Sequence, residues 1–198
     1  MARSRFDKVS FFYDFVEKFL LKDYQGSLEI FDEHLTIQPH DVLLEIGGGT
    51  GLISKALKTK TKSITVVDLS RKMLWKVQDP VLTVLQANGT HLPFHEKSVD
   101  IAYFVNTLHH IPKPDQKLVL QETFRVLKEP GTIFIIEVWY PDTFTVRLFT
   151  KFEDFLVGKA DHISPEQLTT ILQDIGFQNV KTFYPKKHSW KYVAMAMK

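Results

Sequence analysis

The chain has 198 residues, of which 44% are hydrophobic and 24% charged, and its formal net charge is +2. This length predicts a single domain, residues 1–198, and so small a charge does not favour a nucleic-acid partner. The absence of cysteine excludes disulfides and thiolate metal sites, and it fits a cytoplasmic protein. No apolar stretch reaches the ~18–20 residues of a membrane-spanning helix, and charged residues interrupt any signal-peptide run near the N-terminus.

The N-terminal region, residues 1–38, predicts two helices. Apolar side chains recur near helical spacing over residues 5–22, and a second helical pattern covers residues 24–37. A buried strand is then predicted at residues 42–46 (VLLEI), and it runs directly into a glycine-rich turn at residues 47–51 (GGGTG). Because glycine has no side chain, we expect backbone N–H groups of this turn to approach a ligand closely.

Strands and helices alternate after the turn. A second apolar strand ends in Asp68, an acid placed to bind the two hydroxyls of a ribose. The predicted elements are a helix at 51–59, a strand at 63–68, a helix at 71–78, strands at 81–86 and 99–104, a helix from 112 to 128, a turn at 130–131 and a strand at 132–138. This alternation predicts an α/β fold with a doubly wound, mostly parallel sheet.

The C-terminal region has a different pattern. Residues 164–167 (SPEQ) form a capping-box signature, and Gly176 ends the helix that follows. Residues 177–184 and 189–197 predict two further strands joined by a short connection.

The order of the glycines distinguishes between cofactor classes. A dinucleotide site prefers G-x-G-x-x-G, whereas this turn has a carboxylate, Glu45, two residues before Gly47. A carboxylate there would repel a pyrophosphate and favour a cation such as a sulfonium or an ammonium. A glycine turn without any ligand is the structural alternative, although so many glycines would destabilise a purely structural turn.

At this point the chain resembles the class I S-adenosylmethionine-dependent methyltransferases, in particular the type 11 subgroup, and distantly the quinone-biosynthesis C-methyltransferases. The motifs that carry the resemblance are, in order, the glycine run at 42–51, DLSRKML at 68–74, QANGTHLPF at 86–94, VDIAYF at 99–104 with LHHI at 108–111, and FRVLKEPG at 124–131. The resemblance implies a Rossmann-like, seven-stranded sheet with an antiparallel C-terminal hairpin whose last strand lies beside strand five. It also implies lid elements at 1–38 and 139–163, and S-adenosylmethionine as the cofactor.

The resemblance also implies a set of cofactor-binding residues. Gly47 and Gly49 would bring backbone against the methionine part, which Glu45 would hold through its ammonium unless it only fixes the turn. Asp68 would accept from the ribose hydroxyls. Asn88 departs from the family, which usually has aspartate there to accept from the adenine amino group. The remaining candidates are Gly51, Leu69, Met73, Gly89, Phe104, Val105, His109 and Tyr13.

A general base is needed only if the acceptor is a hydroxyl, an ammonium or an acidic carbon. The candidates are His109, His110, Tyr140, Tyr13, Asp142 and His162, and the sequence does not choose among them. Packing or loop hydrogen bonding is the alternative for the histidines. The chain has no cysteine and no H-x-x-H or H-E-x-x-H spacing, which argues against a built metal site.

The acceptor has to be inferred from the predicted lid. Aromatic residues are frequent in the N-terminal helices and in residues 139–163, which favours a small apolar or aromatic acceptor. A hydrophobic core under a long loop would give the same composition. Two other functions remain open, a nicotinamide-dependent oxidoreductase and a non-catalytic S-adenosylmethionine-binding regulatory subunit that needs a partner chain. The oligomeric state does not follow from the sequence.

Overall fold

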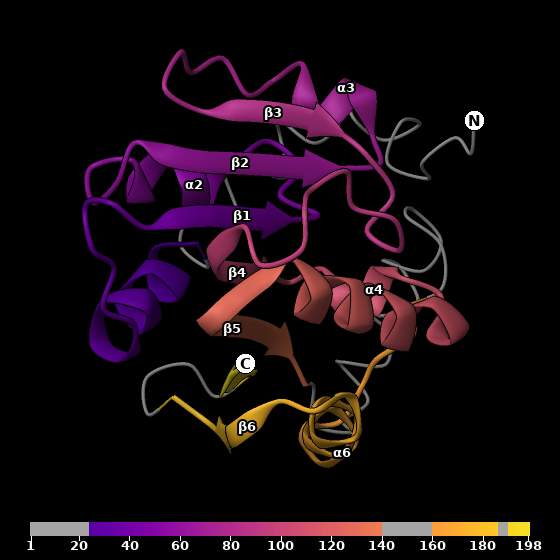
Figure 1. The fold of residues 1–198 in the computed structure, drawn as a ribbon. Coiled ribbons are helices and arrows are strands. Elements are labelled where there is room, and N and C mark those ends of the chain that lie inside the picture. The colour runs from indigo at the N-terminus through magenta and orange to yellow at the C-terminus, as the bar shows by residue number, and fades with distance from the viewer. Residues whose placement is uncertain (1–23, 140–159, 186–189) are drawn as a thin grey trace.

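The computed structural model describes residues 24–139, 160–185 and 190–198, and within them seven strands form one sheet in the order β3-β2-β1-β4-β5-β7-β6 (Figure 1). The strands are β1 (Val42–Ile46), β2 (Ser63–Asp68), β3 (Thr83–Gln86), β4 (Val99–Val105), β5 (Leu127–Val138), β6 (Gln178–Phe183) and β7 (Lys191–Met197). The first five are parallel, and β7 runs antiparallel between β5 and β6. The predicted fold class and the insertion of the last strand beside β5 are therefore confirmed.

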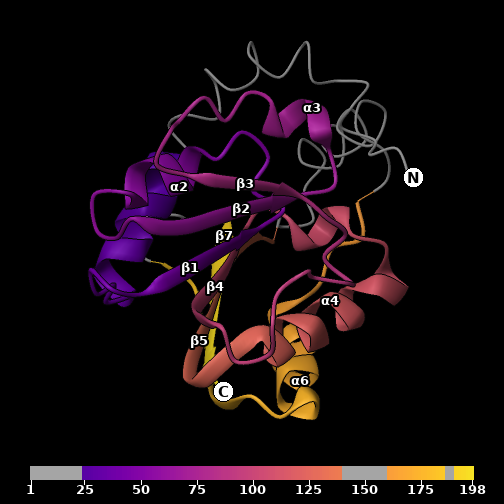
Figure 2. The same ribbon diagram turned by 45° about the horizontal axis from the view of Figure 1, so that its top comes forward.

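Helices cover both faces of the sheet. They comprise a helix at residues 24–34, α2 (Leu52–Leu57), α3 (Arg71–Leu74), a 3-10 turn η1 (Leu108–His110), α4 (Lys113–Val126) and α6 (Pro165–Ile175). Figures 1 and 2 show α4 and α6 on one face, and α2 with the helix at 24–34 on the other. The predicted helix at 5–22 and most of the predicted lid at 139–163 lie outside the described residues.

The core consists of two clusters of buried side chains, and neighbouring residues of β4 belong to different ones. Ala102 and Phe104 belong to the cluster that contains apolar residues of α4 and α6. Tyr103 and Val105 belong to the cluster that contains Phe31 and residues of α2. Successive strand residues point to opposite faces, so a strand buried on both faces is apolar throughout. This explains why β4 is apolar except for Asp100, and why residues 133–136 of β5 form an unbroken apolar run.

Two elements differ most from their predicted bounds. The helix predicted at 71–78 ends at Leu74, and the chain continues in tighter turns in which Lys76 N–H donates to the Met73 carbonyl at 3.0 Å. The strand predicted at 132–138 begins earlier, at Leu127. Its pairing with β4 shifts between Val99 and Ile101, so the predicted Pro-Gly turn is contained within the strand as an irregularity.

The predicted capping box of α6 is present. Ser164 Oγ accepts from Gln167 N–H at 3.2 Å, and Gln167 Oε1 accepts from Ser164 N–H at 3.2 Å. Gly176 ends the helix with a φ of +115°, a conformation that favours glycine. Across the described ranges, the structure contains no helix that is both long and apolar enough to cross a membrane.

Candidate cofactor site

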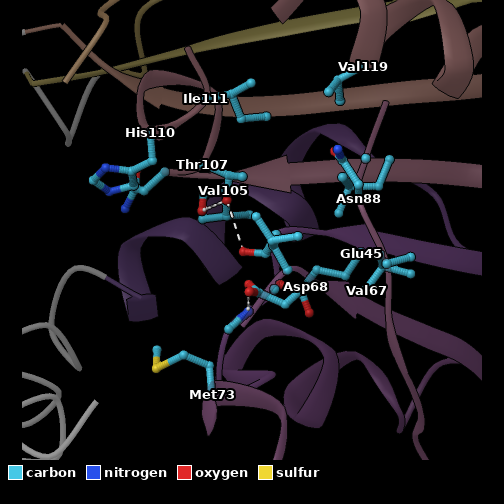
Figure 3. Close-up of a pocket in the computed structure, with 18 of the residues that line it drawn as sticks. Glu45, Val67, Asp68, Met73, Asn88, Val105, Thr107, His110, Ile111 and Val119 are labelled. Atoms are coloured by element: carbon cyan, nitrogen blue, oxygen red, sulfur yellow. Dashed lines mark hydrogen bonds between the residues drawn. The ribbon is translucent and has the colours of Figure 1, made fainter. Parts of the chain in front are cut away.

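A cavity of about 380 Å³ opens where β1, β2 and β4 end, and Figure 3 shows the side chains around it. The carboxyl ends of parallel strands are where ligands bind in open α/β sheets, and this volume lies in the usual range for small-molecule sites. Of the residues predicted from the sequence to bind the cofactor, the cavity is lined by Glu45, Gly47, Gly49, Asp68, Leu69, Met73, Asn88, Gly89 and Val105.

Close packing after β1 requires glycine in the turn. Gly47 has a φ of +70°, and a Cβ added there would lie 2.1 Å from Thr107 Cγ2. Its N–H donates to the Val67 carbonyl at 2.7 Å, and Gly49 N–H donates to Asp68 Oδ2 at 2.9 Å. The N–H groups of Gly48 and Gly51 are bonded to backbone carbonyls as well. The expectation that these N–H groups face a ligand is therefore wrong, because those of residues 47–49 donate to acceptors at the end of β2 and that of Gly51 donates within the turn.

Glu45 lies at the base of the cavity and is buried, with 3% of its surface exposed. Ser54 Oγ donates to Glu45 Oε2 at 2.5 Å and lies 2.7 Å from the Tyr103 hydroxyl. Because Ser54 has one hydroxyl proton, Tyr103 donates to Ser54 when Ser54 donates to Glu45. Burial raises the pKa of Glu45 to about 7, against the lowering effect of the Ser54 hydrogen bonds. The carboxyl is therefore poised to change charge near neutrality.

Asp68 ends β2 and lines the cavity. Its Oδ2 accepts from Gly49 N–H at 2.9 Å, and its Oδ1 accepts from Ser70 N–H at 2.6 Å. A carboxylate oxygen can accept more than one hydrogen bond. Ser70 is the N-cap of α3, and its Oγ accepts from Met73 N–H at 3.3 Å.

Two apolar walls face each other across the next part of the cavity. Leu69 and Met73, at the end of β2 and on α3, were predicted. Ile111, which follows η1, and Val119, which is on α4, were not predicted. The signal for the second wall is weak in sequence, because a four-residue spacing of apolar residues is equally typical of a helix that packs in the core. Asn88 is exposed, and its Oδ1 accepts from Thr90 N–H at 3.1 Å.

The turn after β4 forms a further wall and is held by a buried carboxylate. Glu137, fully buried on β5, accepts at Oε1 from Thr107 N–H at 2.7 Å and from Leu108 N–H at 2.6 Å. Its Oε2 lies 2.6 Å from Nδ1 of His109. The single hydroxyl proton of Thr107 is shared between the carbonyls of Gly47 and Val105, each 3.1 Å from Oγ1. Sequence reasoning missed Glu137 and Thr107, although a glutamate inside an apolar strand is a signal that could have found the first.

Several predicted residues do not line the cavity. The side chain of Phe104 packs fully buried in the core, and Gly51 is the N-cap residue of α2, where a Cβ would meet Val77 at 3.1 Å. His109 is buried beside Glu137, and its ring stacks on that of His162 with centroids 5.2 Å apart. His110 does line the cavity. Tyr13, Tyr140 and Asp142 lie outside the described residues.

The carboxylates that line the cavity make it negatively charged. Glu45, Asp68 and Asp115 line it, and none of the described lining residues is lysine or arginine. A pyrophosphate would face three carboxylates here, without cationic side chains to bind it, whereas a sulfonium or an ammonium would be attracted. The residues present therefore fit a positively charged nucleoside cofactor and not a dinucleotide. Within the described ranges, no group of three or more acidic or histidine side chains is arranged to hold a metal ion.

Comparisons with known proteins agree with this geometry. Residues 44–135 match a methyltransferase domain family, Methyltransf_11. A demethylmenaquinone methyltransferase from Thermotoga maritima is 30% identical over 75% of this chain and 67% of its own length.

Solved structures show the same fold. An S-adenosylmethionine-dependent methyltransferase from Thermotoga maritima, a possible histamine N-methyltransferase, has a TM-score of 0.75 at 24% identity, covering 96% of this chain and 98% of that one. A methyltransferase in complex with the Trm112 methyltransferase activator of Haloferax volcanii has a TM-score of 0.80 at 16% identity, covering 100% and 99%. With the sequence matches, these findings show that the chain belongs to the class I S-adenosylmethionine-dependent methyltransferases of type 11, enzymes for which S-adenosylmethionine is the methyl donor.

Proposed function

We propose that this enzyme transfers a methyl group to a small apolar or aromatic acceptor and holds S-adenosylmethionine in the cavity at the ends of β1, β2 and β4. The main support for this cofactor site is the charge of the cavity. Three carboxylates line it, and none of the described lining residues is lysine or arginine. The bonded N–H groups of the glycine turn support the same site, because an anionic ligand would need such donors left open.

Each wall of the cavity then has a separate task. Glu45 binds the cofactor ammonium, and the backbone at Gly47 and Gly49 packs against its methionine part. Asp68 accepts from the ribose hydroxyls, and the two apolar walls hold the adenine ring between them. The bound cofactor supplies an activated methyl group. The protein therefore mainly has to hold the acceptor in line, about 3–3.5 Å away, and to exclude water.

The acceptor class rests on two observations. The predicted lid at residues 139–163 is rich in aromatic residues, and the Thermotoga maritima relative is a demethylmenaquinone methyltransferase. If the acceptor has to lose a proton, His110 is the described candidate best placed to take it, because His110 lines the cavity and His109 is held by Glu137 behind it. The cysteine-free sequence favours a cytoplasmic setting for this reaction.

Asp68→Asn is expected to weaken binding of S-adenosylhomocysteine, the demethylated cofactor, by about 10- to 100-fold, because hydrogen bonds to a charged group contribute about 1.5–3 kcal/mol. Isothermal titration calorimetry measures the dissociation constant directly. Asparagine keeps an oxygen for one of the two backbone donors that Asp68 serves, so the fold should persist. The control is Asp174→Asn, an exposed carboxylate on α6. Equal affinities for Asp68→Asn and the control would contradict the ribose role.

The acceptor proposal is tested by methylation assays on the purified chain. Mass spectrometry should detect a methylated product from a reduced demethylated naphthoquinone, and little or none from histamine or nucleic acid. Methylation of histamine alone would contradict the apolar acceptor. Cofactor binding without any methylation would favour the regulatory-subunit alternative, for which the activator-bound Haloferax volcanii structure is a precedent of fold only.

A further inference from the structure

One carboxylate that lines the cavity has no binding role in the proposed placement of the cofactor. Asp115 lies in the first turn of α4, is half-buried and lines the cavity. Among the residues that the structure describes, none donates a hydrogen bond to its carboxylate or forms an ion pair with it. A carboxylate in the first turn is favourable for a helix, but that role does not require it to face a ligand cavity.

The position of Asp115 follows from the face of α4 to which it belongs. Asp115 and Val119 are four residues apart on α4, so they share one face of this helix, and both line the cavity together with Ile111, which precedes the helix. Val119 touches the segment after β3, since a Cβ added to Gly89 would lie 3.3 Å from its two Cγ atoms. Figure 3 shows Ile111 and Val119 along one wall, with Asn88 beneath Val119. Asp115 therefore lies about one helical turn from the contact between α4 and residue 89.

Asn88 is poorly suited to recognise an adenine amino group by itself. Its side-chain oxygen already accepts from Thr90 N–H at 3.1 Å in a local turn, and the residue is exposed. A neutral amide oxygen also forms a weaker bond than a carboxylate does. At position 88, where the family usually has a carboxylate, this chain therefore has an amide whose oxygen already accepts a local hydrogen bond.

We propose that Asp115 accepts a hydrogen bond from the 6-amino group of the cofactor adenine and thereby determines the specificity for this base. Ile111 and Val119 on either side of it provide apolar surface for the flat ring, and their low polarity strengthens a charged bond at the ring edge. The carboxylate absent from residue 88 is supplied from α4, across the cavity. This inference rests on the proposed placement of the cofactor.

The test compares S-adenosylhomocysteine with S-inosylhomocysteine, whose base differs in its 6-substituent and in carrying a proton on N1, by isothermal titration calorimetry. The second ligand has a carbonyl oxygen in place of the amino group and would face the Asp115 carboxylate with an acceptor. The wild-type chain should prefer the adenine ligand by at least about tenfold. Asp115→Ala should reduce that preference to within about threefold, and Asp115→Asn, whose amide can donate to the carbonyl, should reduce it further. Asp174→Ala, on the surface of α6, should retain the wild-type ratio.

Three results would overturn the proposal. An unchanged ratio in Asp115→Ala, with normal binding of both ligands, would remove Asp115 from adenine recognition and leave the cofactor site intact. A ratio lost in Asn88→Ala and retained in Asp115→Ala would assign the base to Asn88. Binding of neither ligand by the folded wild-type chain would contradict the cofactor placement itself. Circular dichroism of each variant distinguishes these results from misfolding.

Discussion

Glu137→Ala is expected to lower the free energy of unfolding by about 3–5 kcal/mol, the cost of removing one partner from a buried charged network. Glu137 is fully buried and serves three donors, the N–H groups of Thr107 and Leu108 and the imidazole of His109. Alanine would leave all three without an acceptor and would leave a cavity behind them. Urea denaturation followed by circular dichroism gives the difference. For a chain of this size it corresponds to a fall in Tm of roughly 10 °C.

Two variants separate the network from a general effect of removing charge. Glu137→Gln keeps an oxygen for the two backbone N–H groups, and its amide can donate to Nδ1 of His109, so its cost should be about 1–2 kcal/mol. Glu129→Ala removes an exposed carboxylate from the same strand and should change the free energy of unfolding by less than about 0.5 kcal/mol. If Glu137→Ala were no less stable than Glu129→Ala, the carboxylate would not be what holds the turn after β4.

The same network connects stability to binding. Thr107 is held by Glu137 at its N–H, and its shared hydroxyl proton also bonds the Gly47 carbonyl, so the turns after β1 and β4 are tied together. Loss of Glu137 would loosen the wall that Thr107 and His110 form. Glu137→Gln should therefore retain more cofactor affinity than Glu137→Ala when both variants are folded.

The sequence predicted the sheet well because its signals are local. β1 and β2 have the predicted bounds, and the acid at the end of β2 lies at the cavity. Glu137 could not be assigned a role in this way. Its three donors lie about thirty residues earlier in the chain and reach it only because β4 and β5 pair in parallel, with Val105 beside Ile136.

The glycine turn shows a second limit of sequence reasoning. Gly47 and Gly49 line the cavity as predicted and Gly51 does not, but the direction of the N–H groups was not predictable from the glycines. That direction is set by carbonyl and carboxylate acceptors at the end of the neighbouring strand, at Val67 and Asp68. The cavity residues from α4 were missed for a related reason, since their helical spacing does not distinguish a ligand wall from a core.

Glu45 is expected to make the stability of the chain depend on pH in a defined direction. Burial raises its pKa from 4.5 to about 7, and Asp68 adds to the rise whereas Lys55 and the Ser54 hydrogen bonds oppose it. The folded chain therefore retains a proton that the unfolded chain has already lost between these two values. The resulting stabilisation is complete below the lower value and is lost as the pH rises through the upper one, by on the order of 3 kcal/mol in total.

The difference in unfolding free energy between the wild-type chain and Glu45→Gln isolates this contribution, because other carboxyls titrate alike in both. Glutamine stays neutral, so the wild-type chain should lose stability relative to Glu45→Gln as the pH rises through this window. A difference independent of pH would mean that Glu45 titrates normally despite its burial.

Cofactor binding should reverse the preference of Glu45 for its neutral form. An ammonium next to the carboxyl favours the ionised state, so binding at about pH 6 should release most of a proton and affinity should rise with pH up to about 7. Calorimetry in two buffers of different ionisation enthalpy measures the release. S-adenosylhomocysteine carries the ammonium, whereas methylthioadenosine lacks it and should release no proton. Equal release by the two ligands would contradict an ammonium contact, and no release by either would mean that Glu45 only holds the turn through Ser54.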